Sequence, residues 1–405
     1  MAQQISLFDG TQPLKIDKPI RLIELFAGIG SQAKALKNIG ADFEHYRICE
    51  FDKYAVKSYN AIHGTAFEPS DITKITADDL GIEDTDKYCY IMTYSFPCQD
   101  LSNAGNGKGM TKGSGTRSGL LWEVERLLTE TESLPQILVM ENVPQVIGAK
   151  AMPDFAQWIA FLDELGYKSK YAVLNAKDYG IPQNRERCFM VSVLGDYFYE
   201  FPSKMPLKKR LKDMLEERVD ERYYLTDSSS PKHNNRVIEP IIWDGFSITR
   251  MRQDSECVGT ITQNVGADLK CNGQGVIEPM DKYDLSEKMK RYINSYDEKY
   301  KVSDGNLIVN REIAVAKTTR EGSTRADASD YISADMEDNK NIAGMDCVPF
   351  RIRKLTPKEC WRLMGFTDED VDKAVAVGIS NAQLYKQAGN SIVVQVLEGI
   401  FKQMF

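Results

Sequence analysis

The stretch Ile20–Phe26, IRLIELF, is followed at once by AGIGSQAKALKNIG over 27–40. A short apolar run, a turn with two glycines and an amphipathic segment predict a buried strand that leads into a helix. Further apolar runs predict strands at 46–51, 88–95, 137–142, 169–175 and 188–194. Amphipathic segments lie between them. Buried strands that alternate with helices indicate an α/β fold, with a mainly parallel sheet covered by helices on both faces.

Ligands of such sheets bind beyond the carboxyl ends of the strands, so we expect the functional motifs at those ends. The first turn, with Gly28 and Gly30, does not have the spacing G-x-G-x-x-G. A dinucleotide is therefore not specifically indicated. The two glycines still allow the backbone to approach a ligand and expose the amino end of the helix that follows. A tight turn without a ligand is an equally simple interpretation.

The alternating pattern stops near residue 200. The chain is polar and turn-rich over about 201–346, and strand–helix order returns with RKLTPKECWRLMGF at 353–366. We predict a flexible tail over 1–18, an α/β domain over 19–198 plus 381–405, and a second, smaller domain with a hinge over 199–380.

Composition narrows the classes of function. The net charge of −8 argues against a protein that is basic throughout, but contacts to phosphates need only a local basic surface. The eight cysteines form no C-x-x-C pair, and there are only three histidines. A zinc site, a disulfide scaffold and a multi-histidine metal site are therefore not expected, and a reducing cytoplasm fits best. No apolar stretch is long enough to span a membrane, and the start MAQQISLFDG is not a signal peptide.

Several strand ends carry side chains suited to binding or chemistry. Glu50 follows the second strand, where a carboxylate accepts hydrogen bonds from a ribose. Asp71 and Ile72 place a carboxylate beside an apolar side chain, which suits the amino group and the ring face of adenine. Cys98 follows a strand and Pro97 and precedes a polar loop, so we expect it to be accessible. The alternatives are a buried cysteine and solvated acids.

Six segments taken in order are more specific than any of these residues alone. They are FAGIG (26–30), SFPCQDLS (95–102), ENV (141–143), QNRER (183–187), RKLTPKECWRLMGF (353–366) and QAGNSIVVQV (387–396). They resemble the signature blocks of DNA cytosine-5 methyltransferases, especially the bacterial and phage branch. The resemblance implies a Rossmann-like S-adenosylmethionine-dependent methyltransferase sheet. It also implies that 199–380 is a target-recognition domain with its hinge.

The same resemblance implies the catalytic residues. Cys98 matches the nucleophile that adds to C6 of cytosine and thereby activates C5. Arg185 and Arg187 are expected to lower the pKa of this thiol, and Arg187 to contact the cytosine O2. Glu141 matches the carboxylate that engages N3 and the exocyclic amine, which requires a raised pKa. No residue is indicated as the base that removes the C5 proton, and water is our preferred acceptor.

Cofactor and DNA contacts follow from the resemblance as well. The residues expected to bind S-adenosyl-L-methionine are Phe26, Gly28, Gly30, Glu50, Phe51, Asp71, Ile72, Pro97, Asn390 and Ser391. Phe51 stands where the family often has tryptophan, and an aromatic contact to adenine survives that change. The residues expected to contact DNA are Gln99, Ser102, Asn142, Gln183, Thr260 and Ile261. The target base must be flipped out of the duplex, and we expect the loop 99–117 to close over it.

Two other functions remain open from the sequence. One branch of this family modifies tRNA with the same blocks, although the long middle region favours double-stranded DNA. A catalytically inactive DNA-binding regulator is the other alternative, against which the intact catalytic set argues. The chemistry does not require a dimer, so a monomer is expected.

The segment Gln4–Phe8, QISLF, resembles the peptide by which bacterial proteins bind the replication sliding clamp. The alternative is a chance match in a disordered end. We expect a bacterial cytoplasmic protein associated with the nucleoid.

Overall fold

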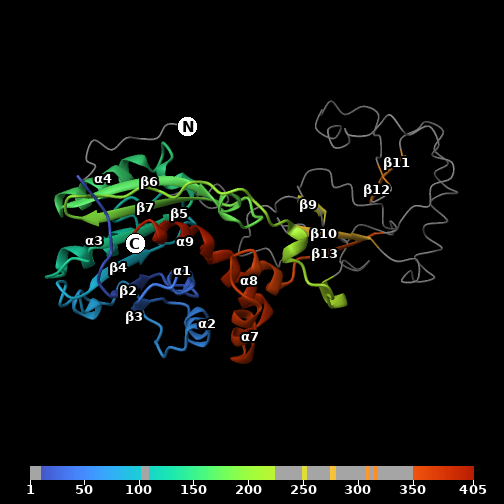
Figure 1. Cartoon of the computed structure of the whole chain (residues 1–405), viewed down its shortest axis with the longest axis horizontal. Helices are drawn as coiled ribbons and strands as arrows, with labels where there is room; N and C mark the ends of the chain where they lie inside the picture. The colour runs from blue at the N-terminus through green and yellow to red at the C-terminus, as the bar shows by residue number, and fades with distance from the viewer. Residues whose placement is uncertain are drawn as a thin grey trace. The chain divides into compact units, whose positions relative to one another are not determined.

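The structure is a computed structural model, and it describes residues 11–101, 109–223, 249–252, 274–279, 307–310, 313–316 and 350–405. Its main feature is a 6-stranded sheet with the order β3-β2-β4-β5-β7-β6 (Figure 1). The strands are β2 (Ile20–Leu25), β3 (Phe43–Cys49), β4 (Cys89–Tyr94), β5 (Ile137–Asn142), β6 (Tyr167–Asn175) and β7 (Glu186–Leu194). All of the predicted strands are present, with ends that differ by at most three residues.

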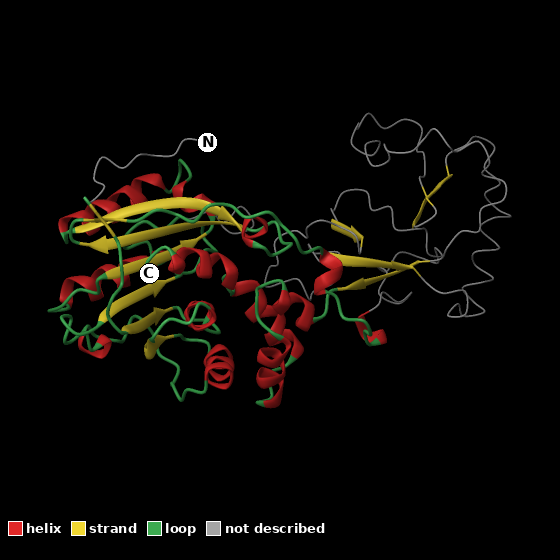
Figure 2. Ribbon diagram, in the orientation of Figure 1, coloured by secondary structure: helices red, strands yellow, loops and turns green. Residues whose placement is uncertain are grey.

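Helices cover both faces of this sheet, as Figure 2 shows and as the alternation of side chains requires. The helices involved are α1 (Ser31–Asn38), α2 (Lys53–His63), α3 (Leu121–Glu130), α4 (Met152–Glu164) and α9 (Val394–Lys402). Tyr90, Met92 and Tyr94 of β4 join α3 and α4 in one apolar core. Glu24 of β2 points to the other face, where its carboxylate accepts from Ala33 N of α1 at 3.3 Å. The α1 helix packs there against α9.

β7 runs antiparallel to its neighbours, so, contrary to the expectation from the sequence, the site is not formed by the carboxyl ends of strands alone. β2, β3, β4 and β5 are parallel, whereas β7 is antiparallel to both β5 and β6. Glu141 near the end of β5 therefore pairs with Phe189 near the start of β7. The segment 183–187 lies at an amino end, yet it reaches the edge of the sheet where β2, β4 and β5 finish.

The C-terminal part forms a helical group. It contains α6 (Pro357–Arg362), α7 (Asp368–Ala376) and α8 (Asn381–Asn390). Thr356 and Glu359 form a capping box that begins α6, as Ser or Thr followed by Glu three positions later predicts. Trp361 is fully buried, and its indole N–H donates to the Leu384 carbonyl at 3.0 Å. The predicted return of strand–helix order is confirmed by β13 (Phe350–Lys354) and α6.

Short elements complete the description. The 3-10 turns are η1 (Asp78–Leu80), η2 (Ser118–Leu120), η3 (Pro144–Ile147), η4 (Ala176–Tyr179), η5 (Leu211–Met214) and η6 (Glu221–Tyr223). The remaining strands are β1 (Gln12–Pro13), β8 (Tyr197–Phe198), β9 (Thr249–Arg252), β10 (Gln274–Pro279), β11 (Leu307–Asn310) and β12 (Ile313–Ala316). β9, β10 and β13 form one sheet, and β11 pairs with β12.

The chain divides into two compact units, and the boundaries differ from those expected. Among the described residues, the first unit holds 11–216 and 356–405, and the second holds 217–223, β9 to β12 and 350–355. The segments 199–216 and 356–380, predicted to belong to the second domain, therefore lie in the first unit. Hydrogen bonds explain this, since Glu216 N donates to Glu359 at 2.9 Å and Arg362 donates to the Leu215 carbonyl at 2.8 Å.

Part of the predicted tail is also structured. β1 pairs with β8, and Ile16 N donates to the Met404 carbonyl at 2.7 Å, so 11–16 lies against the first unit. The clamp-like segment Gln4–Phe8 lies outside the described residues. No helix in the described part of the chain has the length and apolar character needed to cross a membrane.

Candidate active site

Cys98 lies in a loop after β4 that neighbouring elements hold in place. The Asn142 side chain at the end of β5 donates to the Phe96 carbonyl at 2.9 Å. On the other side, the Ser118 hydroxyl of η2 donates to the Pro97 carbonyl at 2.7 Å. These two bonds fix the backbone just before the thiol. Among the cysteines that the structure describes, Cys98 is the one that is not buried, which confirms the expected accessibility.

Asp100 closes the loop that follows the cysteine. Its carboxylate accepts from the backbone N–H groups of Arg117 at 2.9 Å and Ser118 at 3.3 Å. Its carbonyl accepts from Gly109 N at 3.0 Å. The Arg117 guanidinium donates to the side chain of Gln99, one of the residues expected to contact DNA. Both described ends of the predicted closing loop 99–117 are thus anchored beside Cys98.

Glu141 and Arg187 form an ion pair next to the thiol. Arg187 Nε lies 3.2 Å from Glu141 Oε1, and the two side chains are 16% and 12% exposed. Burial raises the pKa of Glu141, and the charges of Arg187 and Arg185 offset only part of that effect. The direction agrees with the prediction for a carboxyl group that must carry a proton.

The pKa of Cys98 is raised overall, despite the two arginines beside it. Burial raises it first, and the neighbouring charge of Glu141 raises it further. Arg187 and Arg185 act in the expected direction and lower it, but they are outweighed. The expected effect of the two arginines is therefore present, but the sequence showed these cations without the degree of burial that outweighs them.

Arg185 links the catalytic edge to the C-terminal helices. Its side chain is buried, and Nη2 donates to the carbonyls of Gly389 at 3.1 Å and Ser391 at 2.8 Å. Burial lowers the pKa of Arg185 to about 9, which leaves the group charged at neutral pH. The two carbonyls flank Asn390, whose side chain is exposed. The predicted catalytic and cofactor residues are thus in direct contact here.

Two residues expected to contact DNA face the interior instead. Asn142 is 2% exposed, and its amide is bonded to Phe96 and to Val143 N at 2.8 Å. Gln183 is fully buried, and its amide donates to the Leu363 carbonyl at 2.7 Å. We correct both assignments, because these side chains orient the site's backbone rather than present donors to a groove. Ser102, Thr260 and Ile261 lie outside the described residues.

The first turn has an unusual backbone. Phe26, Gly28 and Gly30 have φ of 59°, 56° and 80°. A positive φ is rare for a phenylalanine and is kept only where the surroundings hold it, here through Phe26 N donating to the Cys49 carbonyl at 2.7 Å. The Glu50 carboxylate then accepts from Gly28 N at 2.9 Å. Burial is the main reason why the pKa of Glu50 is raised.

The two glycines of this turn have different surroundings. A Cβ on Gly28 would meet nothing within 4 Å, whereas a Cβ on Gly30 would lie 2.3 Å from His63 and 2.6 Å from Tyr59. The open side at Gly28 is consistent with a ligand that approaches the backbone. Gly30 instead allows the turn before α1 to lie against Tyr59 and His63 of α2, a purpose that the sequence did not reveal.

The expected adenine residues lie on separate turns. The Phe51 side chain is 77% exposed, which is unusual for a large aromatic group and leaves its ring face available. Ile72 is buried in the core, and Asp71 accepts from Thr73 N at 3.0 Å. The hydrogen bonds that Asp71 accepts from the backbone N–H and the hydroxyl of Thr73 are the main reason why its pKa is lowered.

Sequence reasoning missed several residues that position the site. They are Asp100, Ser118, Arg126 and Lys386, and the last lies 2.6 Å from Asp52 at the start of α2. Arg126 had a local signal, since glutamates stand three residues before and four residues after it on a predicted helix. The others act through contacts between distant segments and leave no such local pattern.

Comparisons with known proteins identify the family. Residues 20–405 match the family model described as C-5 cytosine-specific DNA methylase. The orphan methyltransferase M.SPRI of Bacillus phage SPR is 32% identical, over 95% of this chain and 97% of its own. The type II methyltransferase M2.ScrFI of Lactococcus lactis subsp. cremoris is 30% identical, over 95% and 99%.

Solved structures bear on the fold alone. The S. pombe Dnmt2 methyltransferase is similar with a TM-score of 0.63 and 20% identity, over 95% of this chain and 98% of that one. The Entamoeba histolytica methyltransferase EhMeth gives 0.64 and 17%, over 96% and 98%. The predicted Rossmann-like methyltransferase fold is confirmed. Because the family model spans nearly the whole chain and two relatives match over almost their full lengths, this protein belongs to the C-5 cytosine-specific DNA methylase family.

Proposed function

We propose that this DNA cytosine-5 methyltransferase bonds Cys98 Sγ to C6 of a cytosine flipped out of double-stranded DNA, within a specific sequence. The observation that carries the proposal is the convergence of three groups at one edge of the sheet. The half-buried thiol of Cys98 interacts electrostatically with Glu141 and Arg187, which form an ion pair with each other. A nucleophile, an acid and a cation are the groups that addition to a pyrimidine requires.

The chemistry begins with the thiolate of Cys98. As the S–C6 bond forms, the electrons of the conjugated C5=C6 and C4=N3 bonds shift so that N3 takes a proton from Glu141 and C5 becomes nucleophilic. Arg187 holds Glu141 in place and supplies positive charge toward the cytosine O2. After methyl transfer, loss of the C5 proton expels the thiolate, and water is our expected acceptor of that proton.

Members of this family use S-adenosylmethionine, and the residues present fit it. When bound, it supplies the methyl group to the activated C5. Gly28 leaves open space beside the turn, Phe51 exposes an aromatic face, and Asp71 presents a carboxylate. We assign binding to these residues together with Phe26, Glu50, Ile72, Pro97, Asn390 and Ser391. Gly30, which lies against Tyr59 and His63, is assigned to the support of this turn rather than to contact with the cofactor.

The different surroundings of the two glycines predict two different defects. Gly30→Ala is expected to lower the free energy of unfolding by about 2–4 kcal/mol, since the new methyl group overlaps Tyr59 and His63 and the φ of +80° is strained. Gly28→Ala shares the strain of a positive φ but meets no neighbour, so it is expected to lower stability less than Gly30→Ala does and to weaken S-adenosylmethionine binding. Urea unfolding and calorimetric titration separate the two. Equal losses of stability in both variants would contradict the assignment.

DNA binding is assigned to both units. We propose that 199–380 includes the parts that read the sequence, with Thr260 and Ile261 near the flipped nucleotide, and that Gln99 and Ser102 contact the DNA from the loop after Cys98. Within the described residues, Asp100 and Ser118 provide fixed ends from which such a loop closes. Binding of the sliding clamp through Gln4–Phe8, a monomeric state and association with the nucleoid remain proposals from the sequence alone.

The direct test is bisulfite sequencing of plasmid DNA from a host that expresses the full chain, beside a Cys98→Ala variant. We expect protected cytosines in one short motif for the wild-type chain and none for the variant. Protection in both samples would contradict the role of Cys98. No protection by a folded chain that binds S-adenosylmethionine would contradict DNA methylation, and would direct the assay to tRNA and then to DNA binding without catalysis.

A further inference from the structure

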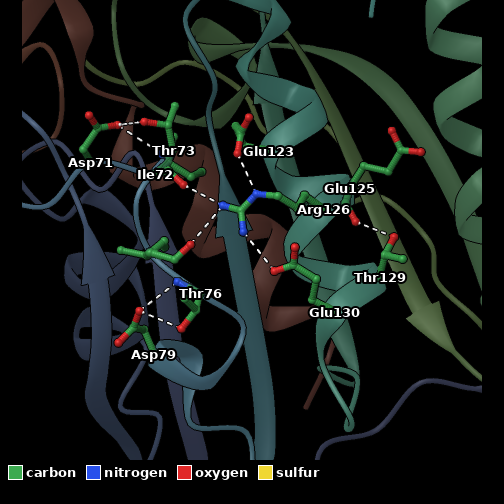
Figure 3. A network of polar contacts seen from close by, with 11 residues as sticks. Asp71, Ile72, Thr73, Thr76, Asp79, Glu123, Glu125, Arg126, Thr129 and Glu130 are labelled. Atoms are coloured by element: carbon green, nitrogen blue, oxygen red, sulfur yellow. Dashed lines mark hydrogen bonds and ion pairs between the residues drawn. The ribbon is translucent and has the colours of Figure 1, made fainter. Parts of the chain in front are cut away.

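Arg126 on α3 contacts the turn that carries Asp71 and Ile72. Its Nη2 donates to the main-chain carbonyls of Ile72 at 3.0 Å and Ile75 at 2.9 Å, and Figure 3 shows the contact to Ile72. The turn comes some fifty residues before the arginine in the chain. One guanidinium nitrogen therefore holds both ends of a four-residue segment that belongs to no helix or strand.

Two glutamates hold the guanidinium itself. Glu123 accepts from Nε at 2.8 Å and Glu130 accepts from Nη1 at 2.9 Å (Figure 3). Both guanidinium nitrogens that do not contact the turn therefore have a carboxylate partner. The side chain of Arg126 is 30% exposed. Exposed pairs of this kind add little stability, but together they restrict the planar group to one orientation. The third donor then points at the carbonyls of the turn.

Ile72, and in part Ile75, also pack against the apolar core, but the other hydrogen bonds of the turn are local. Asp71 accepts from Thr73 N and Oγ1, and its carbonyl accepts from Lys74 N at 2.9 Å. Asp79 closes the next turn in the same way through Thr76. Of the contacts shown in Figure 3, those from Arg126 are the ones that tie the turn to another part of the fold.

We propose that Arg126 is a positioning residue that sets Asp71 and Ile72 against the adenine of S-adenosylmethionine. The inference rests on the proposed assignment of these two residues to the cofactor. A carboxylate that reads the amino edge of adenine must be placed within a fraction of an ångström, and the apolar side chain must meet the ring face at the same time. Charged hydrogen bonds to the two carbonyls set the backbone that carries both groups.

The experiment compares two ligands that differ only at the base, S-adenosylhomocysteine and S-inosylhomocysteine, by calorimetric titration of the full chain. Inosine presents an oxygen where adenine has its amino group, and a carboxylate repels that oxygen. We expect the wild-type chain to prefer adenine by more than about tenfold. Arg126→Gln is expected to weaken the adenine ligand about tenfold and to reduce the preference at least about threefold.

Matched variants separate positioning from stability. The double variant Glu123→Gln with Glu130→Gln removes both negative charges, but the glutamine amide oxygens still accept from Nε and Nη1 and keep the guanidinium directed at Ile72 and Ile75, so it is expected to keep the wild-type preference. Arg126→Lys keeps the charge with one compact donor group in place of the planar fork, and is expected to give an intermediate preference. This variant also serves if Arg126→Gln does not fold.

The outcomes distinguish the inference from the proposed function. If Arg126→Gln weakens the binding of both ligands equally, Arg126 is only a structural residue and the inference is overturned. The inference is also overturned if the glutamate double variant loses the preference for adenine as completely as Arg126→Gln does. A wild-type chain that binds both ligands equally would overturn the role of Asp71 in reading adenine. A wild-type chain that binds neither would overturn the cofactor assignment itself.

Discussion

Cys98→Ser is expected to lower the rate of cytosine methylation by a factor on the order of 10⁴ or more. A serine hydroxyl does not ionise near neutral pH and adds to C6 far more slowly than a thiolate. The substitution changes one atom in a half-buried position. The Phe96 and Pro97 carbonyls keep their partners Asn142 and Ser118, so the loop keeps its place. Folding and cofactor affinity are expected to remain close to those of the wild-type chain.

Two measurements check this outcome. The first is the rate of methyl incorporation into DNA that contains the motif found by bisulfite sequencing. The second uses 5-fluorocytosine at the target, because fluorine cannot leave C5 as a proton does and the protein–DNA bond is retained on a denaturing gel. The wild-type chain should give this bond, and the serine variant should not.

Cys89→Ser is the matched control. Cys89 begins β4, at the opposite end of the strand from Cys98, and burial raises its pKa to about 12. Its thiol is therefore not ionised at working pH, and the control should keep its methylation rate. A similar loss of activity in both variants would show that the cysteines support the sheet rather than the reaction.

Glu141→Gln is expected to separate two properties of Cys98. Glutamine has the shape of glutamate but cannot donate an acidic proton to N3, so methylation is expected to fall by about 10²–10⁴. The negative charge of Glu141 is one cause of the raised pKa of Cys98. Removing it makes the thiolate easier to form, and Arg187 is no longer paired with that charge. The variant should thus be a poorer enzyme with a more reactive thiol.

The sign of the second effect follows from the pKa directions. A lower pKa of Cys98 means that more thiolate is present at any pH below that pKa. Alkylation by iodoacetamide at pH 8 should therefore be faster in Glu141→Gln than in the wild-type chain. The modified peptide is measured by mass spectrometry, so that other cysteines do not contribute.

Glu132→Gln makes the same change at an exposed site after α3 and should alter neither rate. Unchanged or slower alkylation in Glu141→Gln would contradict the electrostatic coupling between the two groups. Undiminished methylation would contradict the role of Glu141 as the proton donor. The two readouts therefore test separate statements about one side chain.

Most of the fold could be predicted from local sequence patterns. The apolar runs placed all six strands of the main sheet, and the amphipathic segments placed α1 to α4, because the period of side-chain burial along a strand or helix is a local property. The six signature segments indicated the family and the position of the nucleophile. That Cys98 is not fully buried also followed from its immediate neighbours, a proline before it and a polar loop after it, although its degree of burial did not.

Tertiary structure decided which polar groups face the site. Asn142 and Gln183 turn inward because Phe96 and Leu363, distant in the chain, offer carbonyls that would otherwise be unsatisfied. The domain boundaries moved for the same kind of reason, since Glu216 N donates to Glu359 and Arg362 donates to the Leu215 carbonyl across a large separation in sequence. Hydrogen bonds between remote segments have no local period, so no pattern in the sequence indicates them.

The chemistry of the site was likewise determined partly by the sequence and partly by the tertiary structure. The sequence by itself determined that a cysteine, a glutamate and two arginines are present in the blocks of a cytosine-5 methyltransferase. Only the folded chain decided that burial and Glu141 outweigh the arginines at Cys98, and that Arg126 holds the turn at Ile72. A pKa and a carbonyl contact both depend on distance and solvent exclusion. Distance and solvent exclusion are set only when the strands have packed. The antiparallel direction of β7 brings Arg185 and Arg187 to the same edge of the sheet as Cys98.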